Sequence, residues 1–231
     1  MKSEPVVVAA PAALGAASLK SARTAAVIEV TAMIALLLSY IWGWQGAFRG
    51  SFITLLVLYF GLGLVSHIRR GETPRDIGLR IENVPRALVN AAIIFVPVIA
   101  LALLIGLALD SWHFRSLETV VAGAPSMLAW ALAQQYGLLC FLYRRFRDIF
   151  GTEHRAAVSA SLAFALFHVP NPFLVPVTLA AGLAACTLYR REPNVLVIGL
   201  AHAMTSYSLL CSLPGSVTYG LRVGPGFFAL H

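Results

Sequence analysis

The stretch Met127-Leu-Ala-Trp-Ala-Leu-Ala-Gln-Gln-Tyr-Gly-Leu-Leu-Cys-Phe-Leu-Tyr143 is apolar except for two adjacent primary amides, Gln134 and Gln135. It is long enough to cross the hydrocarbon core of a bilayer, which takes about 17–25 residues. An amide without a hydrogen-bond partner in such an environment costs several kcal/mol. Polar groups at this depth therefore mark either a functional site or hydrogen bonds that join helices of a bundle.

The composition of the whole chain agrees with this interpretation. Hydrophobic residues make up 59% and charged residues 12% of the sequence, and the mean hydropathy is +0.80. Soluble domains carry about 25% charged residues. We therefore expect an integral membrane protein, and the short basic loops between apolar runs argue against a nucleic-acid partner.

Seven apolar runs predict an all-α fold, a polytopic bundle of about seven membrane-spanning helices. The expected spans are 25–44, 51–67, 87–109, 121–143, 156–169, 173–189 and 194–212. Three parts follow from them. Residues 1–24 are expected to form a flexible cytoplasmic tail, 25–212 the transmembrane domain, and 213–231 an extracytoplasmic segment with a turn or a re-entrant piece.

The distribution of basic residues predicts the orientation. Of the 17 lysines and arginines, 14 fall in one set of alternating loops and 3 in the other. The positive-inside rule then places the N-terminus in the cytoplasm and the protein in the cytoplasmic, or inner, membrane. The basic loop at 71–85 is amphipathic and is expected to lie along the cytoplasmic interface.

Few polar side chains remain deep within the spans, and those with proton-transfer or amide chemistry gather in the C-terminal half. His168 comes just before Pro170, which cannot continue a helix, and Phe164 lies one turn before it. Ser206 is expected on the same helical face as His202. Adjacent residues of a helix point about 100° apart, so the two glutamines share a cavity only if it is broad. The deep polar residues are Glu29, Asn90, Gln134, Gln135, His168, Thr178 and His202, with Thr205 and Ser206 beside the last.

Structural interpretations stand beside the functional ones. In the structural interpretation, each histidine and the glutamine pair serve to join helices by hydrogen bonds and have no further role. Glu29 can be structural, or it can move into a site from the first span. A metal pair of His168 and His202 is disfavoured, because no carboxylate or thiol lies near them in sequence. The three cysteines are interpreted as small buried hydrophobes. We therefore expect no metal and no cofactor.

The order of these motifs resembles the CPBP family of intramembrane endopeptidases, which includes the CAAX prenyl proteases. That family has Glu-Glu-x-x-x-Arg, then Phe-x-x-x-His, then His-x-x-x-Asn/Asp. The resemblance covers roughly residues 75–212 and is best from Phe164 to His202. Phe164 and His168 match the second motif fully. His202 matches the third, although Ser206 stands in place of Asn or Asp.

The first motif departs from the family pattern. Gln134 and Gln135 occupy the glutamate positions, and Leu139 occupies the arginine position. The resemblance implies that the glutamates activate water and that the histidines position water or stabilise an oxyanion. It makes Gln134, Gln135, His168 and His202 the candidate catalytic residues, and Phe164, Leu139, Ser206 and Asn171 of the Asn-Pro turn the candidate binding residues.

The three departures belong together electrostatically. An amide cannot accept a proton as a general base must, and an arginine without its glutamate partner would be an unpaired charge in lipid. The resemblance then leaves three functions open. These are an endopeptidase in which a histidine serves as base, a non-proteolytic scaffold or chaperone, and an enzyme acting on a lipid or isoprenoid. The expected partner is a membrane-embedded peptide, a lipidated protein or a lipid.

Overall fold

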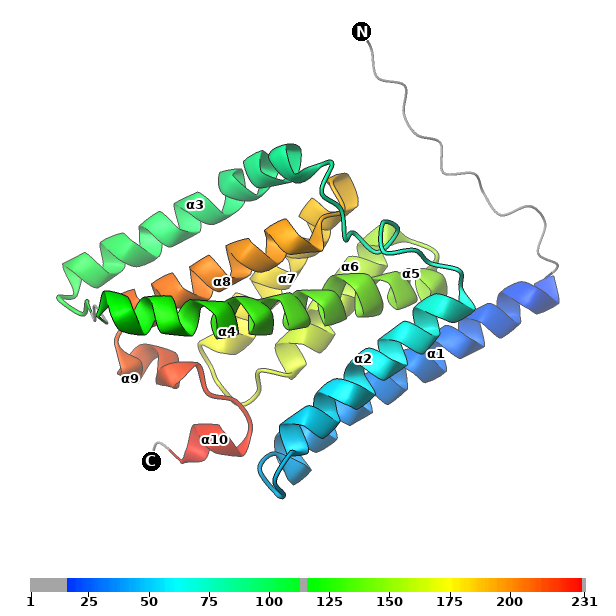
Figure 1. The fold of residues 1–231 in the computed structure, drawn as a ribbon, viewed down its shortest axis with the longest axis horizontal. Helices are drawn as coiled ribbons and strands as arrows, with labels where there is room; N and C mark the ends of the chain where they lie inside the picture. The colour runs from blue at the N-terminus through cyan, green and yellow to red at the C-terminus, as the bar shows by residue number, and fades with distance from the viewer. Residues whose placement is uncertain (1–15, 113–115, 230–231) are drawn as a thin grey trace, which may run out of the picture.

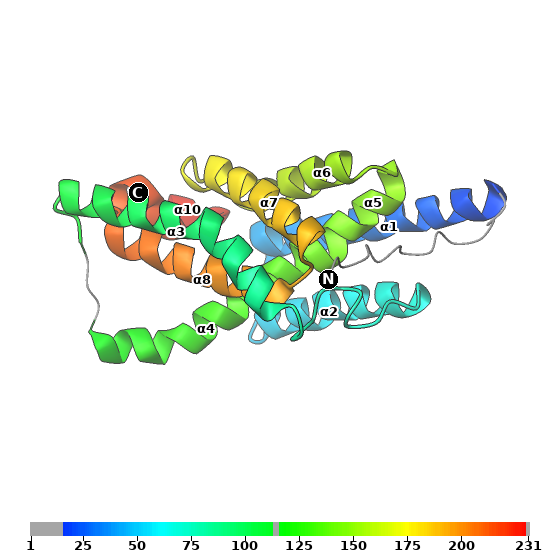
Figure 2. The same cartoon turned by 90° about the horizontal axis from the view of Figure 1, so that it is seen from above.

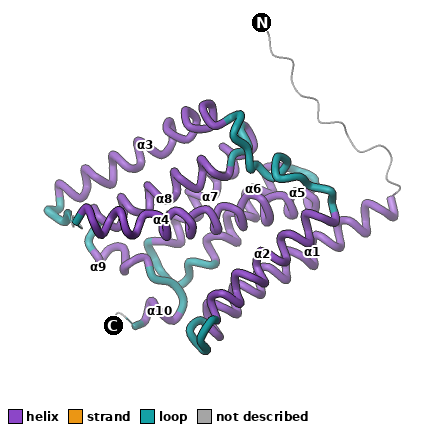
Figure 3. Tube along the Cα trace, in the orientation of Figure 1, coloured by secondary structure: helices purple, strands orange, loops and turns teal. Residues whose placement is uncertain are grey.

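The computed structural model describes residues 16–112 and 116–229, and the regular structure of these residues is entirely helical (Figures 1 and 3). The elements are α1 (Ala16–Ser39) with η1 (Tyr40–Trp44), α2 (Ser51–Arg69), α3 (Val84–Ala108), α4 (Leu117–Gln135), η2 (Tyr136–Tyr143), α5 (Arg144–Phe150), α6 (Glu153–Leu166), α7 (Leu174–Arg191), α8 (Val195–Ser212), α9 (Gly215–Thr218), η3 (Tyr219–Leu221) and α10 (Pro225–Phe228). The expected helical membrane bundle is confirmed.

Each of the seven apolar runs falls on helix, and four helices are long and apolar enough to cross a membrane by themselves. These four are Lys20–Trp44, Ser51–Arg69, Val84–Ala108 and Val195–Ser212. Two boundaries differ from expectation by more than four residues. The first helix begins at Ala16, so the part of the expected tail from 16 to 24 is helical, whereas residues 1–15 lie outside the described residues. The fourth run continues through α5 as far as Phe150, because no Pro or Gly stops it earlier.

The helices form two groups on either side of a line made by α4, η2 and α5 (Figure 1). In Figures 1 and 2, α1 and α2 run side by side as a pair, and α3, α8, α6 and α7 lie on the other side of the line α4–η2–α5. Segment η2 forms the centre of the core, since every residue from Gly137 to Tyr143 is buried. Gln135 immediately precedes this segment, and the site is therefore positioned by the most enclosed part of the molecule.

Segment η2 is a π-helix of eight residues inserted between two α-helices. Its hydrogen bonds run from residue i to residue i+5, so the helix is locally wider and the side chains after Gln135 are rotated relative to those before it. Such segments are rare and are found frequently at functional sites. The apolar run at 127–143 does not signal this feature.

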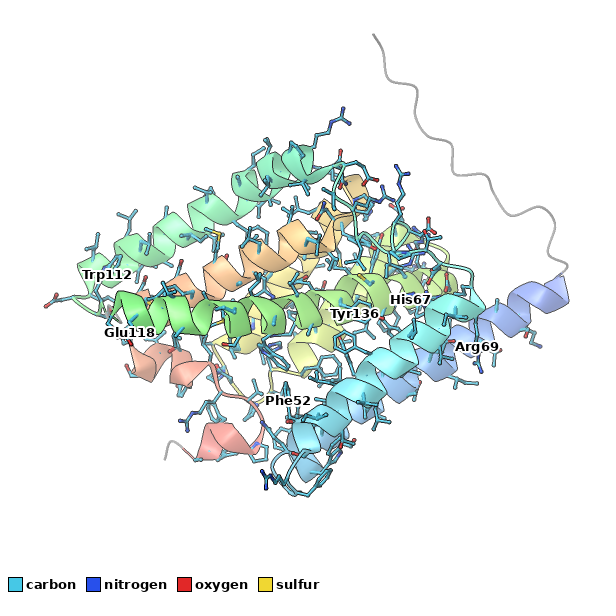
Figure 4. All side chains as sticks on the ribbon, in the orientation of Figure 1. Phe52, His67, Arg69, Trp112, Glu118 and Tyr136 are labelled. Atoms are coloured by element: carbon cyan, nitrogen blue, oxygen red, sulfur yellow. The ribbon has the colours of Figure 1, made fainter. Side chains whose placement is uncertain are left out.

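Two tyrosine–glycine contacts join α2 to the α4–η2 line. The Tyr59 hydroxyl donates to the Ala133 carbonyl at 2.7 Å and lies directly over Gly137, where a Cβ would overlap it. The Tyr136 hydroxyl lies over Gly63 in the same way. Figure 4 shows Tyr136 between the two helices, where its ring also meets His67 edge to face at 5.8 Å. Glycine is required at both positions because each accommodates a tyrosine from the opposite helix.

Ionic contacts join the ends of α2 and α5 to the loop between α2 and α3. Glu72 accepts hydrogen bonds from His67 Nδ1 at 2.6 Å, from Arg144 and from the fully buried Arg145, which also pairs with Asp148 at 2.9 Å. Burial acts to raise the pKa of the Glu72 carboxyl, but the His67 hydrogen bond and the two arginine charges outweigh it and lower that pKa to about 2. This ionic cluster fixes α5, and through it the α4–η2 line, against α2.

The segment after α8 folds back onto the turn between α6 and α7. Asn171, which is fully buried, donates from Nδ2 to the carbonyls of Thr218 and Arg222 at 3.1 and 3.0 Å. Its Oδ1 accepts from the backbone N–H groups of Phe173 and Leu174 at the start of α7. One side chain therefore begins α7 and holds the C-terminal segment against the turn that carries His168.

Candidate functional site

Gln135 and His202 form the centre of the candidate site. Gln135 ends α4, His202 lies in the middle of α8, and Gln135 Nε2 is 2.9 Å from His202 Nδ1. The glutamine is 4% exposed, and its buried Oε1 has no hydrogen-bond partner among the described residues. Because the amide nitrogen donates to Nδ1, the neutral imidazole of His202 carries its proton on Nε2. The site therefore contains one unpaired buried acceptor and one N–H donor.

His168 is held by the helix that precedes it. Its Nδ1 donates to the carbonyl of Phe164 at 2.7 Å. A carbonyl in the last turn of an α-helix has no partner within the helix, so it is available to a side chain that follows. The bond places the His168 proton on Nδ1 and leaves a lone pair on Nε2. His168 thus offers an acceptor where His202 offers a donor.

Phe164 brings the two histidines together. Its ring meets His168 edge to face with centroids 4.9 Å apart, and it meets His202 in the same manner at 6.3 Å. The phenyl ring is buried in the main apolar core and supplies no polar group of its own. The Phe-x-x-x-His spacing thus places both imidazoles in contact with the same phenyl ring.

Three of the predicted site residues do not join this arrangement through hydrogen bonds. Gln134 is only partly buried, as is Ser206, and neither has a hydrogen bond among the described residues. Leu139 is 0% exposed and packs in the main apolar core. An arginine at position 139 would be surrounded by hydrocarbon side chains, which explains why leucine accompanies the glutamines.

Two further residues have structural contacts instead. Asn171 uses both Nδ2 hydrogens and both Oδ1 acceptor positions within the protein, which leaves none for a ligand. Glu29 accepts from the Ser66 hydroxyl at 2.7 Å and pairs with Arg70 at 2.8 Å. The carboxylate of the first span is therefore bonded near the ionic cluster and does not reach Gln135.

One contributor to the site, the Phe164 carbonyl, was not predicted from the sequence. It acts through the backbone, so its residue type carries no signal, but a histidine four residues later and just past the helix end would have indicated it. No group of three or more His, Cys, Asp or Glu that could hold a metal ion occurs over 16–112 and 116–229.

In chemical terms, the site is neutral and rich in directed hydrogen-bonding groups. It presents the acceptors Gln135 Oε1 and His168 Nε2 and the donor His202 Nε2–H. In the described part of the chain, no carboxylate is bonded to either histidine. The arrangement is suited to bind a group with its own N–H or O–H and carbonyl, such as a peptide bond or a water molecule.

Comparison with known proteins gives one finding. A family model described as type II CAAX prenyl endopeptidase Rce1-like matches residues 116–208, which contain Gln135, Phe164, His168 and His202. No curated protein and no solved structure matches the chain. The matched part begins with α4 and ends within α8, so it holds every helix that contributes to the site. Residues 116–208 are therefore similar to the Rce1-like, CAAX-protease-type family, and the apolar helices on either side of this part indicate an integral membrane protein.

Proposed function

We propose that this CAAX-protease-type protein binds a membrane-embedded or lipidated peptide at Gln135 and His202 without cleaving it through a carboxylate base. One observation carries the proposal. The Gln135 amide is bonded to His202 on one side and has a buried, unpaired Oε1 on the other.

The chemistry of the amide supports binding over cleavage. A general base has to accept a proton at the working pH, and a primary amide is too weakly basic to do so. The remaining acidic candidate, Glu29, is bonded to Ser66 and Arg70. Gln135 keeps the size and hydrogen-bonding capacity of a glutamate while it removes the charge and the proton acceptor.

The unpaired carbonyl supports a peptide as the ligand. A buried acceptor without a partner costs about 1–3 kcal/mol. The backbone N–H of an extended peptide also lacks a partner within a bilayer. A bond between the peptide N–H and Gln135 Oε1 satisfies both groups, and His202 Nε2–H is then free to donate to the peptide carbonyl. Binding is favourable because it pairs Gln135 Oε1 with the peptide N–H, and each of these groups is costly when it has no hydrogen-bond partner.

A slow endopeptidase is the second candidate, and the tautomer of His168 favours it. The Phe164 carbonyl leaves Nε2 of His168 with a lone pair that can take a proton from water. His202 Nε2–H would then stabilise the oxyanion. The imidazolium so formed has a carbonyl as its partner instead of a carboxylate. Loss of the carboxylate from a Ser-His-Asp triad costs about 10⁴-fold in kcat.

The test uses the full chain in lipid nanodiscs and a synthetic farnesylated peptide that carries a photoreactive group. We expect the peptide to crosslink to the protein and to keep its full mass after prolonged incubation. Gln135→Leu should lower the crosslinking yield several-fold, because it removes the acceptor and keeps the volume. Gln134→Leu is the matched control and should leave the yield unchanged, since Gln134 makes no hydrogen bond to any residue that the structure describes.

Two outcomes count against binding alone. Shortened peptides that disappear with His168→Ala would establish the slow endopeptidase and replace the binding proposal. Equal crosslinking of the native chain and of Gln135→Leu would show that the peptide does not use the amide. An unlipidated peptide of the same sequence separates recognition of the peptide from recognition of the farnesyl chain.

A further inference from the structure

A hollow of about 440 Å³ lies where the first turns of α3 meet the turn between α7 and α8. Both cartoon views place these two segments beside one another (Figures 1 and 2). The hollow is shallow and open to its surroundings. None of the site residues Gln135, His168 or His202 lines the hollow. The lining residues are Pro85, Arg86, Val89, Asn90 and Glu192.

Opposite charges line the hollow without neutralising one another. Arg86 is exposed and Glu192 is partly exposed, and no ion pair joins them within the described part of the chain. Asn90 adds an amide, and no hydrogen bond occupies it among the same residues. The hollow thus offers an anion-binding group and a cation-binding group, separated by more than the length of a direct ion pair.

Glu192 is held in place by a chain of amides. Asn83 Nδ2 donates to Glu192 Oε2 at 3.2 Å, and Asn83 Oδ1 accepts from Asn194 Nδ2 at 2.8 Å. Asn194 is fully buried and begins α8 through its own Oδ1, which accepts from Val197. One carboxylate oxygen of Glu192 is therefore fixed, and within 16–112 and 116–229 no group bonds to Oε1.

The hollow lies at the end of a candidate membrane span, where we expect lipid headgroups. Helix α3 is one of the four candidate membrane spans, and Arg86 lies in its first turn. Val89 is 62% exposed, and Ile93, on the same face one turn further on, is also exposed. This face passes from a charged hollow to an apolar surface that matches a lipid acyl chain.

We propose that this hollow binds a phospholipid whose headgroup carries both a phosphate and a primary amine. The phosphate accepts from Arg86 and from the Asn90 amide, near the N-terminus of α3, where the helix dipole favours an anion. The ammonium donates to Glu192 Oε1. A choline headgroup has no N–H for that bond, and a glycerol headgroup has no cation to face the carboxylate.

The test is a native mass-spectrometry titration of the delipidated full chain with phosphatidylethanolamine, phosphatidylcholine and phosphatidylglycerol of identical acyl chains. We expect phosphatidylethanolamine to bind about fivefold more tightly than either of the others, the effect of one charged contact near a headgroup surface. Glu192→Gln, which keeps the bond from Asn83, should lower its affinity to that of phosphatidylcholine. Arg86→Gln should weaken binding of all three lipids.

Matched variants at the same end of the bundle serve as controls. Glu82→Gln and Arg191→Gln each remove an exposed charge outside the hollow and should leave the preference intact. Circular dichroism melting checks that every variant is folded. Equal affinities of the native chain for the three lipids would overturn the proposal. So would tighter binding of phosphatidylglycerol, or an unchanged preference in Glu192→Gln.

Discussion

At the residue scale, Gln135 leaves one buried carbonyl oxygen without a hydrogen bond among the described residues, and this lowers the stability of the folded protein until a ligand pairs with it. Gln135→Leu gives up the bond to His202, and interhelical hydrogen bonds in membranes contribute about 0.6 kcal/mol on average. It also removes a buried unpaired carbonyl, which is unfavourable by about 1–3 kcal/mol. We therefore expect the free energy of unfolding in detergent micelles to stay equal to that of the native chain or to rise. A loss above about 2 kcal/mol would show that the amide is primarily structural.

Substitution of Asn171, unlike that of Gln135, should lower the free energy of unfolding. Its side chain makes four hydrogen bonds to backbone groups of the α7 start and the C-terminal segment, and it is fully buried. Asn171→Ala leaves these groups without partners, so we expect a loss of roughly 3 kcal/mol in unfolding free energy. Limited proteolysis should also cut faster within 215–228. Unchanged cleavage there would mean that other contacts hold the segment.

At the element scale, the contact between α2 and the α4–η2 line depends on glycine. Gly137→Ala places a methyl group on the Tyr59 hydroxyl, so the tyrosine has to move and its bond to Ala133 is lost. We expect a cost of about 1–3 kcal/mol in thermal or denaturant unfolding. Tyr59→Phe removes the overlapping oxygen and should recover part of that loss in the double variant. Fully additive effects of the two substitutions would contradict a direct contact.

The ionic cluster predicts a pH dependence. The Glu72 pKa of about 2 in the folded protein lies below the ordinary value of 4.5. Stability from this carboxylate is therefore present above about pH 5 and is lost as the pH falls toward 2. Unfolding midpoints should fall across that window, and Glu72→Gln should flatten the dependence. Glu118→Gln, which removes an exposed carboxylate of α4 outside the ionic cluster, is the matched control.

At the scale of the whole molecule, the charge distribution predicts that Arg49 and Arg75 lie on opposite sides of the membrane. Both are exposed, and Cys140, Cys186 and Cys211 are buried, so the native chain gives little background in thiol labelling. A membrane-impermeant maleimide should label Arg49→Cys in intact cells and Arg75→Cys only after lysis. The reverse pattern would invert the orientation given by the positive-inside rule.

Much of the architecture could be predicted from apolar runs and from proline. The helices over 51–67 and 194–212 appear nearly as expected, and the chain turns before Pro170. The π-helix after Gln135 was not predicted, because the hydropathy of a sequence does not distinguish a π-helical turn from an α-helical turn. The ionic cluster was not predicted either, since Glu72 and Arg144 are 72 residues apart and no local pattern pairs them.

The candidate site was predictable in part. The Phe164–His168 spacing and the resemblance pointed to the residues that the structure brings together around His202. The difference between Gln134 and Gln135 was not predictable, because it depends on which side of α4 faces α8. Leu139 and Asn171 were assigned from motif positions alone, and their packing in the core and in the C-terminal contact is a tertiary property.

The bonds from Asn171 to Thr218 and Arg222 also have a consequence for biogenesis. They join residues 47 and 51 positions apart in the chain. Synthesis proceeds at about 5–20 residues per second, so α6 and the His168 that follows it are made several seconds before residues 218–222. The turn that carries His168 therefore reaches its final packing only after residues 218–222 have been made.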